Sequence, residues 1–129
     1  MRTPRSPCVL IVEDHPLVAL SLQDIVQEIG CEFVGPVATG EDAIKLAEQH
    51  CPDLILMDVE LKGRVNGIDA ATEIKRRFDI PSVFFSGHCD SETKRRAEQA
   101  EPLAFVDKSA LLSNLADLLR SNLSIRPSQ

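Results

Sequence analysis

The chain has 129 residues, which is the usual size of one domain, and no linker or internal repeat divides it. A composition of 43% hydrophobic and 26% charged residues is that of an ordinary soluble globular protein, and it excludes a disordered or fibrous chain. Twenty acidic residues against fourteen basic ones give a net charge of −6, which argues against a broad phosphate-binding surface and hence against nucleic acid as a direct partner.

Five short apolar runs predict five strands. In chain order they cover residues 8–12, 33–37, 54–57, 82–85 and 103–106. The runs lack a clear period-two alternation, which is typical of strands buried on both faces of a sheet. The run 33–37 contains Pro36, which cannot donate a ladder hydrogen bond, so this strand is expected near an edge of the sheet.

Apolar residues recur at helical spacing in the segments between these strands. The four clear stripes are Val18, Leu22, Ile25 and Ile29, then Ala43, Ile44 and Ala47, then Ile68, Ala71, Ile74 and Phe78, and finally Leu111, Leu112, Leu115, Leu118 and Leu119. Thr39, with Asp42 three residues later, is expected to cap the second of these helices. The segment 92–100 has only Ala97 and Ala100 as apolar anchors, which predicts a shallowly packed helix.

Strands that alternate with helices predict an α/β fold, in which a parallel sheet carries helices on both faces. In such sheets the chemistry gathers beyond the carboxyl ends of the strands. Glu13 and Asp14 end the first strand, Asp58 the third and Ser86 the fourth, and Lys108 lies just beyond the fifth. Three carboxylates, one hydroxyl and one ammonium are therefore predicted to converge on one edge of the sheet.

The converging carboxylates predict a site that binds a metal ion and a phosphoryl group. They would repel one another and raise each other's pKa unless a cation lay among them. Mg²⁺ is the natural candidate, because it takes hard oxygen ligands and commonly leaves a position for a phosphate oxygen. Lys108 and Ser86 suit an incoming phosphoryl group, and a carboxylate can itself attack phosphorus to give an aspartyl phosphate. The ordinary interpretations are an acidic helix start at Glu13-Asp14 and a turn residue at Asp58.

These motifs, in this order, resemble a response-regulator receiver domain of two-component signalling. Residues 9–17 (VLIVEDHPL) are similar to the family's opening strand and acidic pair, and residues 54–58 (LILMD) resemble its phosphoacceptor strand. Ser86 matches the Ser/Thr switch, Phe105 the aromatic switch and Lys108 the lysine of the family. The resemblance covers almost the whole chain and implies a flavodoxin-like receiver fold, a five-stranded parallel sheet of order 2-1-3-4-5 flanked by five helices.

The resemblance also implies roles for single residues. Asp58 would accept a phosphoryl group, and Ser86 and Lys108 would hold the phosphoryl oxygens. Phe105 would turn inward when Ser86 moves toward the phosphate. A phenylalanine in a strand is also an ordinary core residue, so core packing and switching are both open for Phe105.

The metal site implied by the resemblance holds Mg²⁺. Its ligands would be Asp14 and Asp58 directly, Glu13 through water and Glu60 through its backbone carbonyl. The loop 59–69 departs from the family pattern because it lacks the Met-Pro pair common after the phosphoacceptor. The family pattern therefore does not predict the geometry of this loop.

The leading hypothesis is a single-domain response regulator, with a receiver domain at residues 8–122 between tails at 1–7 and 123–129. It would take a phosphoryl group on Asp58 from a sensor histidine kinase or a histidine phosphotransfer protein. It would then signal to a downstream protein target by a changed surface. Its own chemistry would be self-phosphotransfer and autodephosphorylation only, so it is not expected to be an enzyme. The resemblance also suggests a homodimer through the face of the fourth helix, fifth strand and fifth helix.

Two alternative functions stay open. The first is a Mg²⁺-dependent phosphohydrolase with Asp58 as its nucleophile, similar to haloacid-dehalogenase-type phosphatases. Those enzymes place an aspartate acid/base two residues after the nucleophile, where this chain has Glu60. The second is a receiver-like interaction module that works without phosphorylation, which the intact set of site residues disfavours.

The remaining features concern location and the cysteines. No apolar stretch reaches the roughly 18 residues that a membrane-spanning helix needs, and the first residues are too polar to begin a signal peptide. A cytoplasmic location without a membrane partner is therefore expected. Cys8, Cys31, Cys51 and Cys89 form no C-x-x-C pair, so reduced thiols are expected rather than a zinc or redox site.

Overall fold

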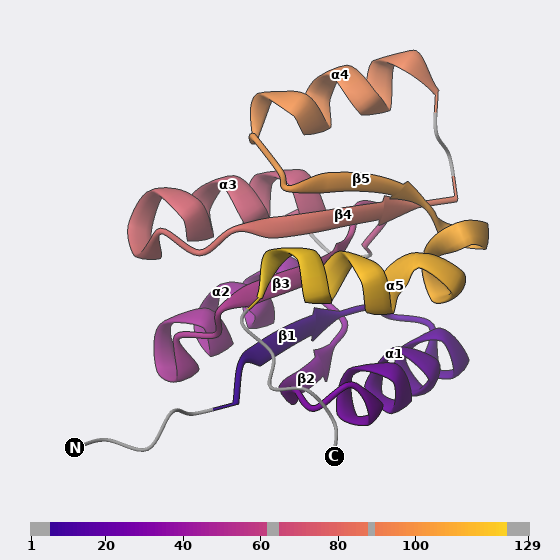
Figure 1. Cartoon of the computed structure of the whole chain (residues 1–129). Helices are drawn as coiled ribbons and strands as arrows, with labels where there is room; N and C mark the ends of the chain where they lie inside the picture. The colour runs from indigo at the N-terminus through magenta and orange to yellow at the C-terminus, as the bar shows by residue number, and fades with distance from the viewer. Residues whose placement is uncertain (1–5, 62–64, 88–89, 124–129) are drawn as a thin grey trace.

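Five parallel strands form a single sheet, whose strands and helices are labelled in Figure 1. The computed structural model describes residues 6–61, 65–87 and 90–123. The strands are β1 (Cys8–Val12), β2 (Glu32–Val37), β3 (Leu54–Asp58), β4 (Ser82–Ser86) and β5 (Ala104–Asp107). They are hydrogen-bonded in the order β2-β1-β3-β4-β5, which confirms the predicted flavodoxin-like sheet.

Four helices connect the strands, a fifth follows β5, and together the five helices cover both faces of the sheet (Figure 1). They are α1 (Pro16–Glu28), α2 (Gly40–His50), α3 (Gly67–Phe78), α4 (Ser91–Gln99) and α5 (Lys108–Asn122). Helices α1 and α5 pack on one face, and α2, α3 and α4 pack on the other. The predicted cap of α2 is present, since Thr39 Oγ1 accepts a hydrogen bond from the Asp42 N–H at 3.1 Å.

Alternating residues of the central strands fill two apolar cores. Every residue of β3 and β4 is buried, as the lack of alternation in their sequences predicted. Leu56 and Phe85 face the core under α1 and α5, whereas Met57 and Phe84 face the core under α2 and α3. Burial on both faces fixes the register of β3, because a shift by one residue would exchange the two sets of side chains.

The predicted edge strand and the predicted shallowly packed helix are both found. Strand β2, which contains Pro36, is an edge strand, and its pairing with β1 is irregular between Leu10 and Val12. In α4 only Ala97 is buried, so this helix is held to the sheet by few apolar contacts. The elements at the periphery are therefore less firmly packed than the central strands that carry the candidate site residues.

Some sequence-based expectations concern residues that lie outside the described ranges. They include most of the two predicted tails, residues 62–64 of the loop after β3, and Cys89. Cys31 and Cys51 are free thiols. Among the described residues, no helix combines the length and the apolar character needed to cross a membrane.

Gly67, the first residue of α3, sets how closely this helix approaches the end of β3. A Cβ at this position would collide with the Asp58 carbonyl oxygen and would lie 3.0 Å from Val59 Cα. We expect Gly67→Ala to lower the free energy of unfolding by about 1–3 kcal/mol, because backbone must shift to admit the methyl group. Gly87→Ala is the matched control, since the nearest atom that its Cβ would meet among the described residues is Glu60 Oε1 at 3.5 Å. Urea denaturation that shows equal losses for both variants would contradict this close packing.

Candidate functional site

Three carboxylates meet at the carboxyl edge of the sheet. Glu13 and Asp14 follow β1, and Asp58 ends β3, which is paired directly with β1. One oxygen of each carboxylate lies within 4.8 Å of the others. Glu13 and Asp58 are only 3% and 1% exposed, whereas Asp14 is half-buried. The structure thus brings the three predicted acidic residues together and removes two of their charges from bulk water.

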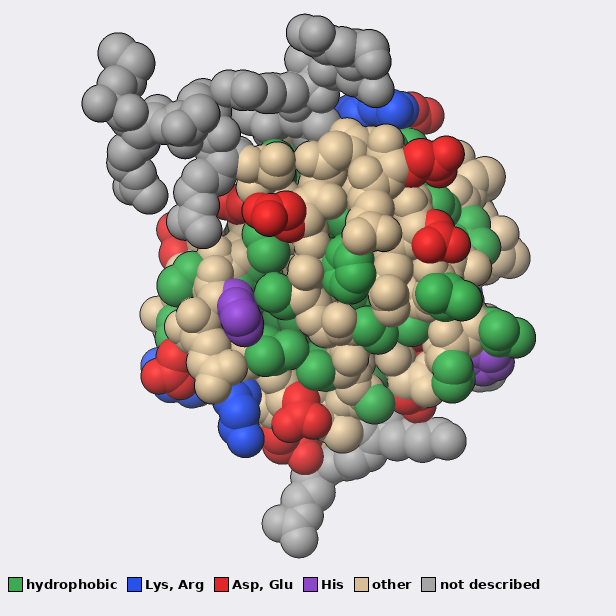
Figure 2. All heavy atoms as spheres, turned by 90° about the horizontal axis from the view of Figure 1, so that it is seen from below, with side chains coloured by type: hydrophobic (Ala, Val, Ile, Leu, Met, Phe, Trp, Pro, Cys, Tyr) green, Lys and Arg blue, Asp and Glu red, His purple; other side chains and the backbone are tan. Residues whose placement is uncertain are grey.

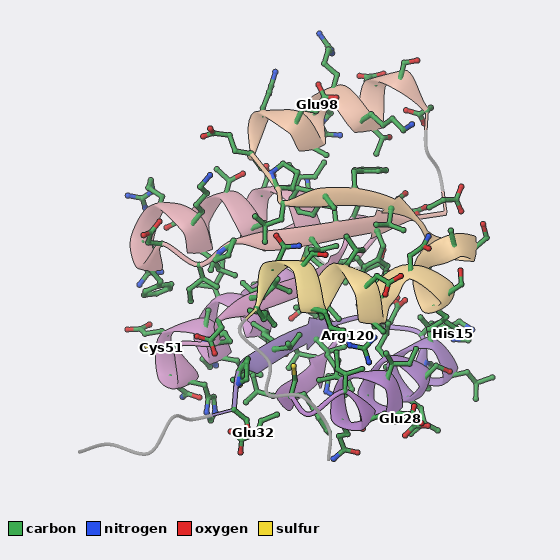
Figure 3. The ribbon with its side chains drawn as sticks, in the orientation of Figure 1. His15, Glu28, Glu32, Cys51, Glu98 and Arg120 are labelled. Carbon is green, nitrogen blue, oxygen red and sulfur yellow. The ribbon has the colours of Figure 1, made fainter. Side chains whose placement is uncertain are left out.

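Local hydrogen bonds hold the acidic pair where the chain turns from β1 into α1. The Glu13 N–H donates to the Val37 carbonyl of β2 at 2.9 Å, and Glu13 Oε2 accepts from the His15 N–H at 3.1 Å. His15, labelled in Figure 3, is the N-cap of α1, and Pro16 begins the helix. Proline suits this position because the first helical N–H has no partner within the helix. The turn therefore fixes Glu13 at the carboxyl edge of the sheet.

Lys108 brings a positive charge to the carboxylates. It is the first residue of α5, and the N-cap of that helix, Asp107, accepts a hydrogen bond from the Ser109 N–H at 2.9 Å. Lys108 Nζ lies 2.9 Å from Glu13 Oε1 and 3.2 Å from Asp58 Oδ2. One ammonium therefore bridges the two buried carboxylates and leaves the cluster with an excess of negative charge.

The excess charge changes the protonation of the site. Burial and the neighbouring Asp58 carboxylate raise the pKa of Glu13 from its ordinary value of 4.5 to about 7, although Lys108 acts in the opposite direction. Burial lowers the pKa of Lys108, but its ion pairs with Glu13 and Asp58 outweigh burial and leave it above the ordinary value. Near neutral pH, a proton on Glu13 therefore compensates part of the negative charge.

The donor set also fits a small hard cation. Glu13 Oε1 is buried and makes no hydrogen bond of good geometry, although it forms the ion pair with Lys108. Carboxylate oxygens gathered within 4.8 Å are the ligands that Mg²⁺ takes, usually with several waters. Glu13, Asp14 and Asp58 could therefore hold Mg²⁺ in place of the proton.

Ser86 and Gly87 present two hydrogen-bond donors beside Asp58. Ser86 ends β4 and is completely buried. Its hydroxyl donates to Glu60 Oε1 at 2.9 Å, and the Gly87 N–H donates to the same oxygen at 2.7 Å. The Glu60 N–H in turn donates to Asp58 Oδ1 at 2.9 Å. The contacts of the Glu60 side chain were missed by the sequence, which assigned only its backbone carbonyl, because spacing does not fix where an exposed loop side chain points.

Phe105 lies on the same face of the sheet as Ser86. Phe105 is paired with Phe84 across β4 and β5, and Phe84 and Ser86 are two residues apart on β4. The ring is half-buried and packs against the core under α2 and α3. The register thus places Phe105 on the strand next to β4, and its role as a switch stays a prediction.

Comparisons with known proteins agree on one family. A family model described as the response regulator receiver domain matches residues 9–120. The transcriptional regulatory protein PdtaR of Mycobacterium tuberculosis is 38% identical over 107 residues, which are 83% of this chain and 52% of PdtaR. The phyllosphere-induced regulator PhyR of Methylorubrum extorquens is 30% identical over 121 residues, 93% of this chain and 45% of PhyR. The chain thus spans about half the length of the curated relatives it matches.

Solved structures show the same fold. The signal receiver domain of a modulated diguanylate cyclase from Desulfovibrio desulfuricans G20 superposes with a TM-score of 0.84 at 29% identity, and the match covers 92% of this chain and 94% of that one. The N-terminal domain of a three-domain response regulator/sensory box/GGDEF protein from Carboxydothermus hydrogenoformans gives a TM-score of 0.77 at 30% identity, with 89% and 92% covered.

The raised pKa of Glu13 predicts a pH-dependent stability. Folded Glu13 binds a proton more tightly than unfolded Glu13, so its stabilising contribution is complete below pH 4.5 and is lost as the pH rises through about 7. In the metal-free protein, the free energy of unfolding of wild type should therefore fall by about 2–3 kcal/mol relative to that of Glu13→Gln as the pH rises across that range. Urea denaturation in EDTA at several pH values measures it, and a difference that stays constant would refute the raised pKa.

Proposed function

The chain belongs to the response regulator receiver domain family, and on that premise we propose that it accepts a phosphoryl group on Asp58. One observation supports this choice above the others. The Asp58 carboxylate is buried at a strand end, with Lys108 Nζ 3.2 Å from Oδ2 and the Glu60 N–H donating to Oδ1. Both oxygens are therefore oriented by a donor, as a nucleophile at a fixed position requires. The phosphodonor would be a phosphohistidine of a sensor histidine kinase or a histidine phosphotransfer protein.

The transfer itself is a displacement at phosphorus. An oxygen of Asp58 forms a bond to phosphorus while the bond from phosphorus to the histidine nitrogen breaks. Lys108 and Ser86 would hold phosphoryl oxygens, because an ammonium and a hydroxyl both donate to them. Mg²⁺, when bound, would neutralise charge on the carboxylates and the phosphoryl group. Its ligands would be Asp14 and Asp58 directly, Glu13 through water and Glu60 through its backbone carbonyl.

The signal would be a change of surface. Ser86 would move toward the phosphoryl group, and Phe105, on the same sheet face, would turn into the space near it. A shift from 1:99 to 99:1 in favour of the active state requires about 5.5 kcal/mol of differential stabilisation. The charge-assisted hydrogen bonds of a phosphoryl group can supply much of that.

A partner that carries the phosphohistidine must reach the carboxyl edge of the sheet. Leu17 and Leu20 of α1 are 70% and 53% exposed, and Leu17 lies three residues after Asp14. Figure 2 looks at the molecule from below, the side on which α1 lies in Figure 1, and shows hydrophobic side chains at the surface among acidic ones. We assign this exposed part of α1 to contact with the phosphodonor, because large exposed apolar side chains beside a reactive edge favour a protein partner.

The proposed phosphorylation of Asp58 does not depend on which segments flank the receiver domain. The receiver boundaries at residues 8–122 and the single-domain form stay predictions, because the curated relatives extend well beyond the region they share with this chain. The phosphohydrolase alternative gains no support from the site. The side chain of Glu60, which would have to serve as acid/base, is hydrogen-bonded to Ser86 and Gly87.

Phosphorylation of Asp58 can be measured directly. Incubation with Mg²⁺ and acetyl phosphate should add one phosphoryl group to wild type by intact mass, and none to Asp58→Ala or to wild type in EDTA. Asp24→Ala, which removes an exposed carboxylate from α1, should be labelled like wild type. Undiminished labelling of Asp58→Ala would refute the assignment. Turnover of p-nitrophenyl phosphate would instead establish the phosphohydrolase.

The proposed homodimer uses the face formed by α4, β5 and α5. A surface groove on this face is lined by Phe105, Val106, Asp107, Ala110, Asn114, Asp117, Leu118 and Ser121. The exposed residues Lys94, Arg95 and Arg96 of α4 are basic, whereas Asp107 and Asp117 beside the groove are acidic, so a two-fold pairing of this face can be complementary in charge.

Pairing through this face should depend on the phosphorylated state. We expect beryllofluoride with Mg²⁺, which mimics an aspartyl phosphate, to raise the dimer fraction in sedimentation velocity. Asn114→Arg should prevent that rise by placing a bulky charge in the groove, while Asp24→Arg on α1 should not. A dimer that forms equally well with Asn114→Arg would exclude this face.

A further inference from the structure

We propose that the Glu60 side chain is a tethered competitor of the phosphoryl group, an anion that occupies phosphoryl-binding donors until phosphorylation displaces it. The inference rests on the proposed function and extends it to regulation of the same site. It starts from one oxygen, Glu60 Oε1, which accepts the Ser86 hydroxyl at 2.9 Å and the Gly87 N–H at 2.7 Å. Two donors that converge on one carboxylate oxygen form a small anion-binding site.

This anion-binding site lies beside the phosphoacceptor. The Glu60 N–H donates to Asp58 Oδ1 at 2.9 Å, so the backbone of Glu60 contacts the carboxylate that would carry the phosphoryl group. Ser86 is the residue to which the proposed function assigns a phosphoryl oxygen. The hydroxyl has a single proton, so it cannot donate fully to Glu60 and to a phosphoryl oxygen at the same time. The two anions therefore compete for the same donor.

Electrostatics makes the competition stronger. An aspartyl phosphate adds negative charge and three acceptor oxygens at Asp58. A Glu60 carboxylate that stayed on Ser86 and Gly87 would face that charge at short range, and like charges at short range repel. Phosphorylation is therefore expected to expel the Glu60 side chain.

The expelled side chain has room to move and a cation nearby. Glu60 is exposed, so it can rotate without disturbing either core. Glu60 and Ser86 line a surface pocket together with Thr93 and Arg96 of α4. Arg96, a cationic residue, thus lines the pocket into which the carboxylate would turn. Displacement of Glu60 would in this way change the contacts of α4, the helix in which only Ala97 is buried.

The test is an equilibrium measurement with beryllofluoride as the probe. Glu60→Gln keeps the shape and the backbone carbonyl but removes the competing charge, so we expect the apparent Kd for beryllofluoride, at fixed Mg²⁺, to fall about tenfold, or 1.4 kcal/mol. Glu98→Gln is the matched control. It makes the same change in net charge on α4, where Glu98 is exposed and lies away from His15 at the site edge (Figure 3). We expect no change in Kd for this control.

A double-mutant cycle separates competition for donors from general charge repulsion. In a Ser86→Ala background the shared hydroxyl donor is gone, so Glu60→Gln should tighten binding by about threefold or less, against tenfold in wild type. An equal effect in both backgrounds would overturn donor competition.

The outcomes also separate this inference from the proposed function. If wild type binds beryllofluoride and is labelled on Asp58, but Glu60→Gln binds no more tightly, the proposed function stands and the competitor role of Glu60 is refuted. If wild type and all variants fail both to bind beryllofluoride and to be labelled, the proposed function falls and the competitor role falls with it. Unfolding by urea checks that each variant is folded.

Discussion

The site depends on an imbalance of charge that the fold creates and does not fully compensate. Strands β1 and β3 are neighbours and run in the same direction, so their ends deliver Glu13, Asp14 and Asp58 to one place. Lys108 bridges two of these carboxylates and has only one positive charge to offer. Burying carboxylates without full pairing is costly. The remaining negative charge must therefore be compensated by a proton on Glu13 or by a bound cation. The state of the site then depends on the pH or on the concentration of that cation.

Packing elsewhere in the molecule offsets the unfavourable free energy of burying these carboxylates. Two apolar cores bury β3 on both faces, so the strand that carries Asp58 cannot slide or turn without exposing large side chains. Gly67 lets the start of α3 approach the Asp58 carbonyl closely, which fixes the end of the strand from another direction. The central strands are tightly packed, whereas the outer elements are packed more weakly. The carboxylate is held still, whereas α4, with only Ala97 buried, is free to respond.

Much of this could be predicted from the sequence, because the deciding signals were local. Short apolar runs predicted the five strands, and the polar residues that follow four of these runs predicted the edge of the sheet that carries the site. Pro36 marked β2 as an edge strand, since it lacks an N–H to donate. Two features could not be predicted. The pKa of Glu13 depends on burial and on the approach of Asp58, and the position of the Glu60 side chain depends on the course of a loop whose sequence departs from the common pattern. Both arise from tertiary geometry.

A buried hydroxyl explains why Glu60 matters to a switch. Ser86 is completely buried, and a buried hydroxyl without an acceptor is unfavourable. If Ser86 donates to a phosphoryl group in the phosphorylated state, as proposed, it needs another acceptor in the resting state. Glu60 Oε1 supplies one, and because it is charged it does so strongly. A strong resting partner also makes activation harder. On the proposed function, Glu60 would thus set the balance between the two states without touching the transferred phosphorus, and its charge would determine how far the balance lies toward rest.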